Sequence, residues 1–147
     1  MRAAKALLDD GAMADGWTRQ HGEVRTAIPV EFPKHVVHSW FVPVTHGDLL
    51  LGFFELTPEL FARRYASFQK RDGSLEGCPP VLDWVDHETV RRKAARHVGL
   101  NVVMGEPYLS YDNYPSRLAW AVPVRSANGS SRVVFVAGDA VFESRGP

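Results

Sequence analysis

Two stretches of the chain repeat one short phrase. SWFVPVTHGD, residues 39–48, contains Trp-Phe-Val-Pro-Val, and LAWAVPVRSANG, residues 118–129, contains Trp-Ala-Val-Pro-Val. Successive side chains of a β-strand point to opposite faces, so the Trp and both Val residues of each phrase share one face. We therefore expect two strands with a packed face, 80 positions apart in the chain.

Turn signals and return strands follow both phrases. Gly47 permits the positive φ of a tight connection, and LLLGFFEL returns, which predicts a hairpin over roughly residues 35–56. Asn128-Gly129 is a strong hairpin signal, SRVVFVAG returns, and Gly138-Asp139 turns the chain once more into AVFES. The sequence thus predicts two similar hairpins.

Two helices are expected between the hairpins. The first spans roughly 57–73, with Thr57 as its cap, Pro58 at its first position and an apolar side that includes Tyr65. The second begins after Asp86 as cap and ends at Gly99. A helical segment over about residues 2–20 precedes the first hairpin.

The order of these elements defines a fold class. Hairpins beside segregated helices indicate an α+β protein with an antiparallel sheet packed against helices, and the repeated phrase suggests an internal pseudo-repeat. A chain of 147 residues with 45% hydrophobic content is expected to form a single domain over 1–147.

Composition narrows the classes of partner. Seventeen basic residues balance seventeen acidic ones, so no global field attracts nucleic acid or an anionic membrane. The single cysteine, Cys78, excludes an internal disulfide and fits a reducing compartment. No apolar run approaches the roughly 18 residues of a membrane span. We expect a cytoplasmic protein that binds neither nucleic acid nor a membrane.

A run of motifs lies between about residues 83 and 143: a short helix ending in glycine (ETVRRKAARHVGL), a strand (EPYLSYD), the strand WAVPV and a return strand with a glycine turn (VVFVAGDAV). In these motifs the segment resembles the PepSY family. This resemblance implies a small helix-on-sheet fold similar to that of cystatins. PepSY domains are associated with propeptides and with restraining or binding peptidases.

Catalytic and metal signatures are weak in this sequence. His35 and His38 in HVVHSW differ by three positions and point to opposite faces of a strand, and His87 and His97 lie far apart along their predicted helix. Asp83 or Asp86 beside His87 is more typical of a helix start than of a metal site. The chain has no Walker, Rossmann or G-x-S-x-G motif, and Cys78 before two prolines is more typical of a loop filler than of a nucleophile. The basic runs at 63–64 and 91–96 are typical of solvated faces. We expect no metal and no cofactor.

The segment EPYLSYDNYPSR carries the candidate binding residues. These are Tyr108, Tyr111, Asp112, Asn113, Tyr114 and Arg117. Tyrosines beside adaptable polar residues are typical of recognition surfaces, which predicts partial exposure of Tyr111 and Tyr114. Alternatively, the tyrosines pack across the sheet while Asp112-Asn113 makes a turn.

Two functions follow from this reading. The first is a non-enzymatic protein- or peptide-binding domain with a regulatory role, of immunity type or restraining a peptidase, whose partners could include a second copy of the chain. The second is a small enzyme similar to the cone-shaped ketosteroid isomerases, with His38 or Asp48 as general base in an internal polar pocket. An enclosed polar pocket would favour the enzyme, and a solid aromatic core would favour the binding domain.

Overall fold

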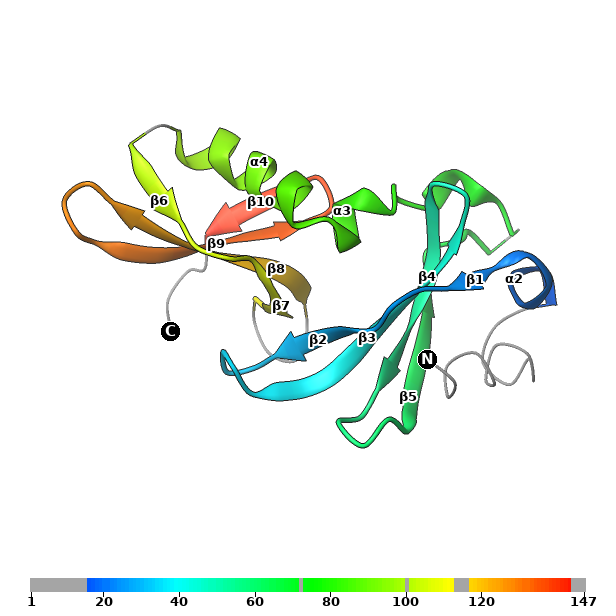
Figure 1. Ribbon diagram of the computed structural model, residues 1–147. Helices are drawn as coiled ribbons and strands as arrows, with labels where there is room; N and C mark the ends of the chain where they lie inside the picture. The colour runs from blue at the N-terminus through cyan, green and yellow to red at the C-terminus, as the bar shows by residue number, and fades with distance from the viewer. Residues whose placement is uncertain (1–15, 72, 100, 113–116, 144–147) are drawn as a thin grey trace. The chain divides into compact units, whose positions relative to one another are not determined.

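The computed structural model describes residues 16–71, 73–99, 101–112 and 117–143. Within these ranges the protein is a strand-dominated α+β structure with a mostly antiparallel sheet, and no helix there is long and apolar enough to cross a membrane. The chain divides into two compact units, which are described separately (Figure 1). The first unit comprises Met1–Val30 and Val37–Val81, and the second comprises Glu31–Val36 and Leu82–Pro147.

The first unit is built on the first copy of the phrase. Its elements are α2 (Gly16–His21), β1 (Glu23–Val24), β2 (Ile28–Glu31, whose last residue belongs to the second unit), β3 (Val37–His46), β4 (Leu49–Leu56), β5 (Ala62–Ser67) and the 3-10 helix η1 (Leu75–Gly77). The strand order is β2-β3-β4-β5, and β1 pairs with the end of β3.

The hairpin predicted over roughly 35–56 is formed by β3 and β4. Trp40 lies opposite Leu56, and a register shift follows Val44. Gly47 has φ 57° in the connection, as the turn requires. Alternating residues of the two strands therefore meet on one face and form a core.

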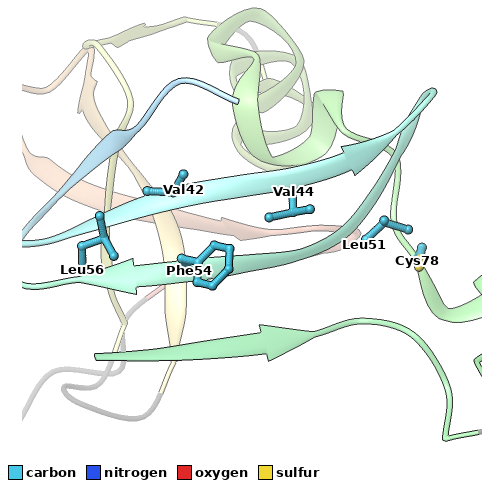
Figure 2. Close-up of a cluster of buried hydrophobic side chains, with 6 residues drawn as sticks. All are labelled: Val42, Val44, Leu51, Phe54, Leu56 and Cys78. Atoms are coloured by element: carbon cyan, nitrogen blue, oxygen red, sulfur yellow. The ribbon is translucent and has the colours of Figure 1, made fainter. Parts of the chain in front are cut away.

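That core is apolar and largely closed to solvent. Figure 2 shows its buried members, which are Val42 and Val44 from β3, Leu51, Phe54 and Leu56 from β4, and Cys78 from the loop after η1. Trp40, Leu49, Tyr65 and Phe68 pack around them and are partly buried. The side chains that the phrase placed on one face of a strand are thus held in the first unit's core.

The predicted helix over 57–73 is wrong, because residues 62–67 form strand β5. Thr57 closes a turn instead of capping a helix: its carbonyl accepts from Leu60 N at 2.8 Å, and its amide donates to Phe61 O at 2.8 Å. β5 then satisfies the backbone groups along the outer edge of β4, which a helix could not do. Gly52 leaves room for this pairing, since a Cβ there would lie 2.3 Å from the carbonyl oxygen of Ala66.

The second unit is built on the second copy of the phrase. Its elements are α3 (Leu82–Val85), α4 (His87–Val98), β6 (Val102–Met104), β7 (Tyr108–Tyr111), β8 (Leu118–Ser126), β9 (Ser131–Ala137) and β10 (Ala140–Glu143). The strand order is β7-β8-β9-β10, β6 pairs with the end of β8, and α4 packs against β8, β9 and β10 (Figure 1).

Helix α4 has the predicted ends. Oδ2 of Asp86 accepts from Thr89 N at 3.0 Å, and Gly99 follows the last turn with φ 79°. Val90 and Ala94 are buried against the sheet. Of the helix predicted over about 2–20, α2 represents the last part, and residues 1–15 lie outside the described ranges.

Equivalent strand pairs of the two units are 80 positions apart. Val24 faces Val44, and Met104 faces Val124. Arg25 N donates to the carbonyl of Pro43 at 2.8 Å, and Gly105 N donates to that of Pro123 at 2.9 Å. The same spacing relates the starts of β2 and β7 and the Trp40–Leu56 and Trp120–Val136 pairs.

Candidate binding surface

Strand β7 positions two of the predicted site residues on opposite faces. It pairs with β8, with Tyr108 opposite Ala121 and Tyr111 opposite Leu118. Tyr111 shares a face with Leu109 and is only 6% exposed. The predicted partial exposure of Tyr111 is therefore wrong, because strand alternation turns this tyrosine into the core of the second unit.

Tyr108 lies on the other face and is half-buried. It packs against a small cluster formed by Ala119, Ala121 and Phe135. The Nζ of Lys34 lies 5.2 Å from the centre of its ring, at cation–π distance. Burial, and secondarily the charge of Glu31, raises the pKa of Tyr108, so its phenol stays protonated and can donate or accept a hydrogen bond.

Asp112 and Arg117 flank the connection between β7 and β8. Asp112 N donates to the carbonyl of Arg117 at 2.9 Å, and Arg117 Nε lies 3.8 Å from Oδ2 of Asp112. The Arg117 guanidinium also lies 4.7 Å from the centre of the Phe142 ring. Asn113 and Tyr114, the remaining predicted site residues, lie outside the described ranges.

The structure places the segment Glu31–Val36 beside strand β7, a contact that the sequence did not predict. Ser110 Oγ donates to the carbonyl of Glu31 at 2.6 Å, and the ring of Phe32 meets that of Tyr111 edge-on at 6.0 Å. About 80 residues separate these partners in the chain, and no local pattern marks such a pairing. The nearest local signal was an apolar pair, Val36-Val37, just after a proline-containing turn.

Internal hydrogen bonds hold the segment in one conformation. Phe32 N donates to Val36 O at 2.9 Å, and Val36 N donates to Pro33 O at 2.9 Å. His35, at φ 72°, donates its amide to Oε1 of Glu31 at 2.8 Å. A non-glycine residue in the left-handed region marks a backbone that its surroundings fix, and such residues cluster at ligand contacts.

The same segment presents apolar groups to solvent. Phe32 is 37% exposed and Val36 is 53% exposed. We call Phe32, Lys34, Val36 and Tyr108 the loop surface. It combines two exposed apolar side chains, a cation and an aromatic phenol, which can bury area and donate hydrogen bonds to a partner.

The residues that the sequence offered for catalysis all belong to the first unit. Cys78 is 8% exposed within the first unit's core, and burial raises the pKa of its thiol, which disfavours the nucleophilic thiolate. His38 is half-buried with Nδ1 3.4 Å from Ser39 Oγ, and Asp48 is exposed in the β3–β4 turn. Neither lines the two surface grooves found in the second unit, of about 460 and 320 Å³.

Part of each basic run pairs with acidic neighbours. Arg63 and Arg64 both bind the carboxylate of Glu55, at 3.1 and 2.8 Å. In α4, Lys93 lies 2.8 Å from Oδ1 of Asp83, and Arg91 pairs with Glu106. These contacts favour a structural role for both runs over phosphate binding.

The fold defines a class, a strand-dominated α+β protein, and its second unit exposes a partly apolar loop. Comparison with known proteins adds no particular relative, because no family model, no curated protein and no solved structure matches the chain. The PepSY-like resemblance of residues 83–143 therefore stays a prediction.

Proposed function

We propose that the protein is a non-enzymatic protein- or peptide-binding domain with a regulatory role, and that it contacts its partner through the loop surface. An immunity-type role or the restraint of a peptidase is the concrete form that the PepSY-like resemblance favours. A cytoplasmic location accords with the single cysteine. The proposed class of partner includes a second copy of the chain.

The observation that supports this proposal is the exposure of Phe32 and Val36 on a segment that internal hydrogen bonds hold in one conformation. Contacts with Ser110 and Tyr111 and the hydrogen bonds within the segment fix its shape before any partner arrives. A fixed aromatic anchor loses little conformational entropy on binding, which is the property of interface hot spots. The surface therefore offers affinity without a catalytic group.

We further infer that the two units arose by internal duplication. The constant spacing of 80 positions through equivalent strand pairs supports this, because the shared register extends well beyond the five-residue phrase. The positions in β2 that correspond to Tyr108 and Tyr111 hold Ile28 and Glu31. Aromatic residues at these places thus belong to the second unit alone, as expected if it specialised in binding.

The test begins with capture of partners from the native source and measurement of each dissociation constant by calorimetry. The double variant Phe32→Ala/Val36→Ser should weaken the complex by about 2 kcal/mol or more, the scale of an aromatic hot spot. Its folding stability should fall by less than its affinity, because Val36 is largely exposed and Phe32 loses an edge-on ring contact with Tyr111.

Val103→Ser is the matched control, since Val103 is 72% exposed on β6 of the same unit but outside the loop surface. It should bind the partner with unchanged affinity. Equal affinities for the wild type and the double variant, with folding intact, would reject the loop surface as the contact.

A further inference from the structure

An open groove lies in the second unit on the face of the sheet that the helices leave uncovered. Trp120 on β8 contacts Trp84 and His87, which belong to α3 and α4. Pro123 and Arg125 lie an odd number of positions further along β8, so they point to the opposite face. The groove has a volume of about 460 Å³, and its lining includes Val103, Gly105, Pro123, Arg125, Ser131 and Val133.

In the first unit, the equivalent place is filled by the side chain of Arg25. Its Nε donates to Oγ1 of Thr45 at 2.9 Å, and Thr45 is 0% exposed. The same register positions 80 residues later hold Gly105 and Arg125, and Arg125 is exposed. Because Gly105 has no side chain, the second unit leaves open the space that Arg25 occupies in the first.

The apolar floor of the groove differs between the units in the same way. Pro43 and Phe53 pair with each other in the first unit, and both are buried. Their counterparts Pro123 and Val133 pair in the same register but are only half-buried. Val103 beside them is 72% exposed. The groove therefore exposes apolar surface whose equivalent in the first unit is covered.

The charge of the groove indicates the chemistry of an occupant. Among the described residues no ion pair involves Arg125, whereas Arg132, which alternation turns to the helix-covered face, pairs with Glu143 at 3.3 Å. A guanidinium presents a planar fork of donors that matches a carboxylate. The first unit places a cation over the hydroxyl of Thr45, but the second unit supplies the cation itself. An occupant of this groove should therefore supply the anion.

The free edge of β6 favours a peptide as the occupant. Gly105 N donates to the carbonyl of Pro123, and backbone groups alternate in direction along antiparallel strands. The N–H and C=O groups of Val102 and Met104 therefore point away from β8. No strand in the described part of the chain pairs with this outer edge of β6 (Figure 1). An extended peptide can add there, with alternate side chains on the groove's face.

We propose that this groove binds an extended acidic segment of a partner protein. An apolar side chain of the segment packs over Gly105 and Pro123, and a carboxylate two positions away pairs with Arg125. The site is separate from the loop surface, so binding here does not need Phe32 or Val36. A small anion and a second copy of the chain are the other occupants that the test distinguishes.

The experiment pans a library of random seven-residue peptides against the full-length Phe32→Ala/Val36→Ser variant, which lacks the loop surface. Its result therefore does not depend on the function proposed above. Enriched peptides should carry Asp or Glu two positions from an apolar residue. The most enriched peptide should bind wild type and bait equally in calorimetry, and more weakly as salt is added, because the ion pair is exposed. Enrichment of only neutral or basic peptides, or no enrichment, would overturn the proposal.

Two variants assign the peptide to the groove. Gly105→Leu should abolish binding, because it fills the groove, and a Cβ there would lie at an ordinary contact distance of 3.4 Å from Cβ of Pro123. Arg125→Glu should weaken the acidic peptide about tenfold or more, since one exposed ion pair is replaced by a repulsion. The same variant should bind a peptide whose acidic residues are changed to lysine better than the wild type does, a reversal that misfolding cannot produce.

Arg92→Glu is the matched charge control, because Arg92 is exposed on α4, away from the groove, and it should bind the peptide as the wild type does. Val103→Ser should weaken this peptide but not the partner of the loop surface, which separates the two sites. Unchanged affinity in both Gly105→Leu and Arg125→Glu would overturn the proposal. So would full competition by free glutamate, or a dimer in sedimentation that Arg125→Glu dissociates, because each assigns the groove to another occupant.

Discussion

The two tryptophans that open the repeated phrases have different surroundings. Trp120 is 1% exposed, its Nε1 donates to the carbonyl of Trp84 at 3.2 Å, and the ring of His87 lies edge-on at 5.0 Å. Trp40 is only partly buried at the border of the first unit's core. The packed face predicted for each phrase therefore holds a fully buried tryptophan in the second unit and a partly buried one in the first.

Replacing each tryptophan should therefore have unequal effects on stability. Trp120→Ala should lower the free energy of unfolding by about 3–5 kcal/mol, since it leaves a large cavity and removes the hydrogen bond to the carbonyl of Trp84. Trp40→Ala should cost clearly less, because part of that side chain already contacts water. Urea denaturation of the two variants in parallel measures the difference, and equal losses would contradict the burial described above.

At the scale of single elements, the sequence signals for helix ends were correct where no strand edge could pair with the same residues. Asp86 and Gly99 delimit α4 as predicted, because a cap acts on amides within three residues of itself. Thr57 and Pro58 gave the same kind of signal for a helix that does not exist. There the edge of β4 pairs with residues 62–67, and a local propensity of tenths of a kcal/mol per residue cannot oppose a full strand ladder.

From the N-cap of α4 we predict how folding stability depends on pH. The hydroxyl and the amide of Thr89, in that order, hold the pKa of Asp86 below its ordinary value. In the unfolded chain the pKa of an aspartate is about 3.9. Because the folded-state pKa of Asp86 is lower, its carboxylate stabilises the folded protein at pH values above about 3.9, and this stabilisation is lost as the pH falls through the folded-state pKa. Asp86→Asn should therefore be less stable than the wild type at pH 7, and the gap should narrow as pH drops below about 4.

Thermal unfolding at a series of pH values measures that gap. Thr89→Val removes the hydroxyl that contributes most to the shift, so the wild-type advantage over this variant should also shrink in acid. A gap between Asp86→Asn and wild type that stays constant from pH 7 to pH 3 would show that the carboxylate charge plays no part in the cap.

At the scale of the whole molecule, the two long hairpins have neighbouring strands of their own unit on both sides. β3 and β4 form this hairpin in the first unit, and β8 and β9 form it in the second. β5 and β10 are the outer strands in the described part of each unit. If the units are duplicates, their local stabilities should follow the same order along the chain.

Amide hydrogen exchange measured by NMR should show that repetition. The slowest amides should lie in β3, β4, β8 and β9, since amides of central strands exchange only through large openings, whereas β5 and β10 should exchange through local fraying. Protection confined to one unit would contradict equivalent cores and weaken the inference of duplication.

The sequence by itself determined the features that depend on near neighbours. The two hairpins, their glycine turns and both ends of α4 follow from alternation, positive φ and capping, all of which act within a few residues. The alternation of side chains along β7 also indicates that Tyr111 is buried, because it shares a face with the apolar Leu109. The antiparallel α+β class follows from these elements alone.

Only the tertiary structure decided the features that depend on distant partners. Residues 62–67 are a strand because β4 offers an unpaired edge, and Glu31–Val36 forms a surface because Ser110 and Tyr111 lie beneath it. Nδ1 of His46 donates to the carbonyl of His21 because β3 runs past the end of α2. Each of these contacts joins segments whose spacing in the chain carries no periodic signal, so packing and hydrogen-bond satisfaction across the fold selected them.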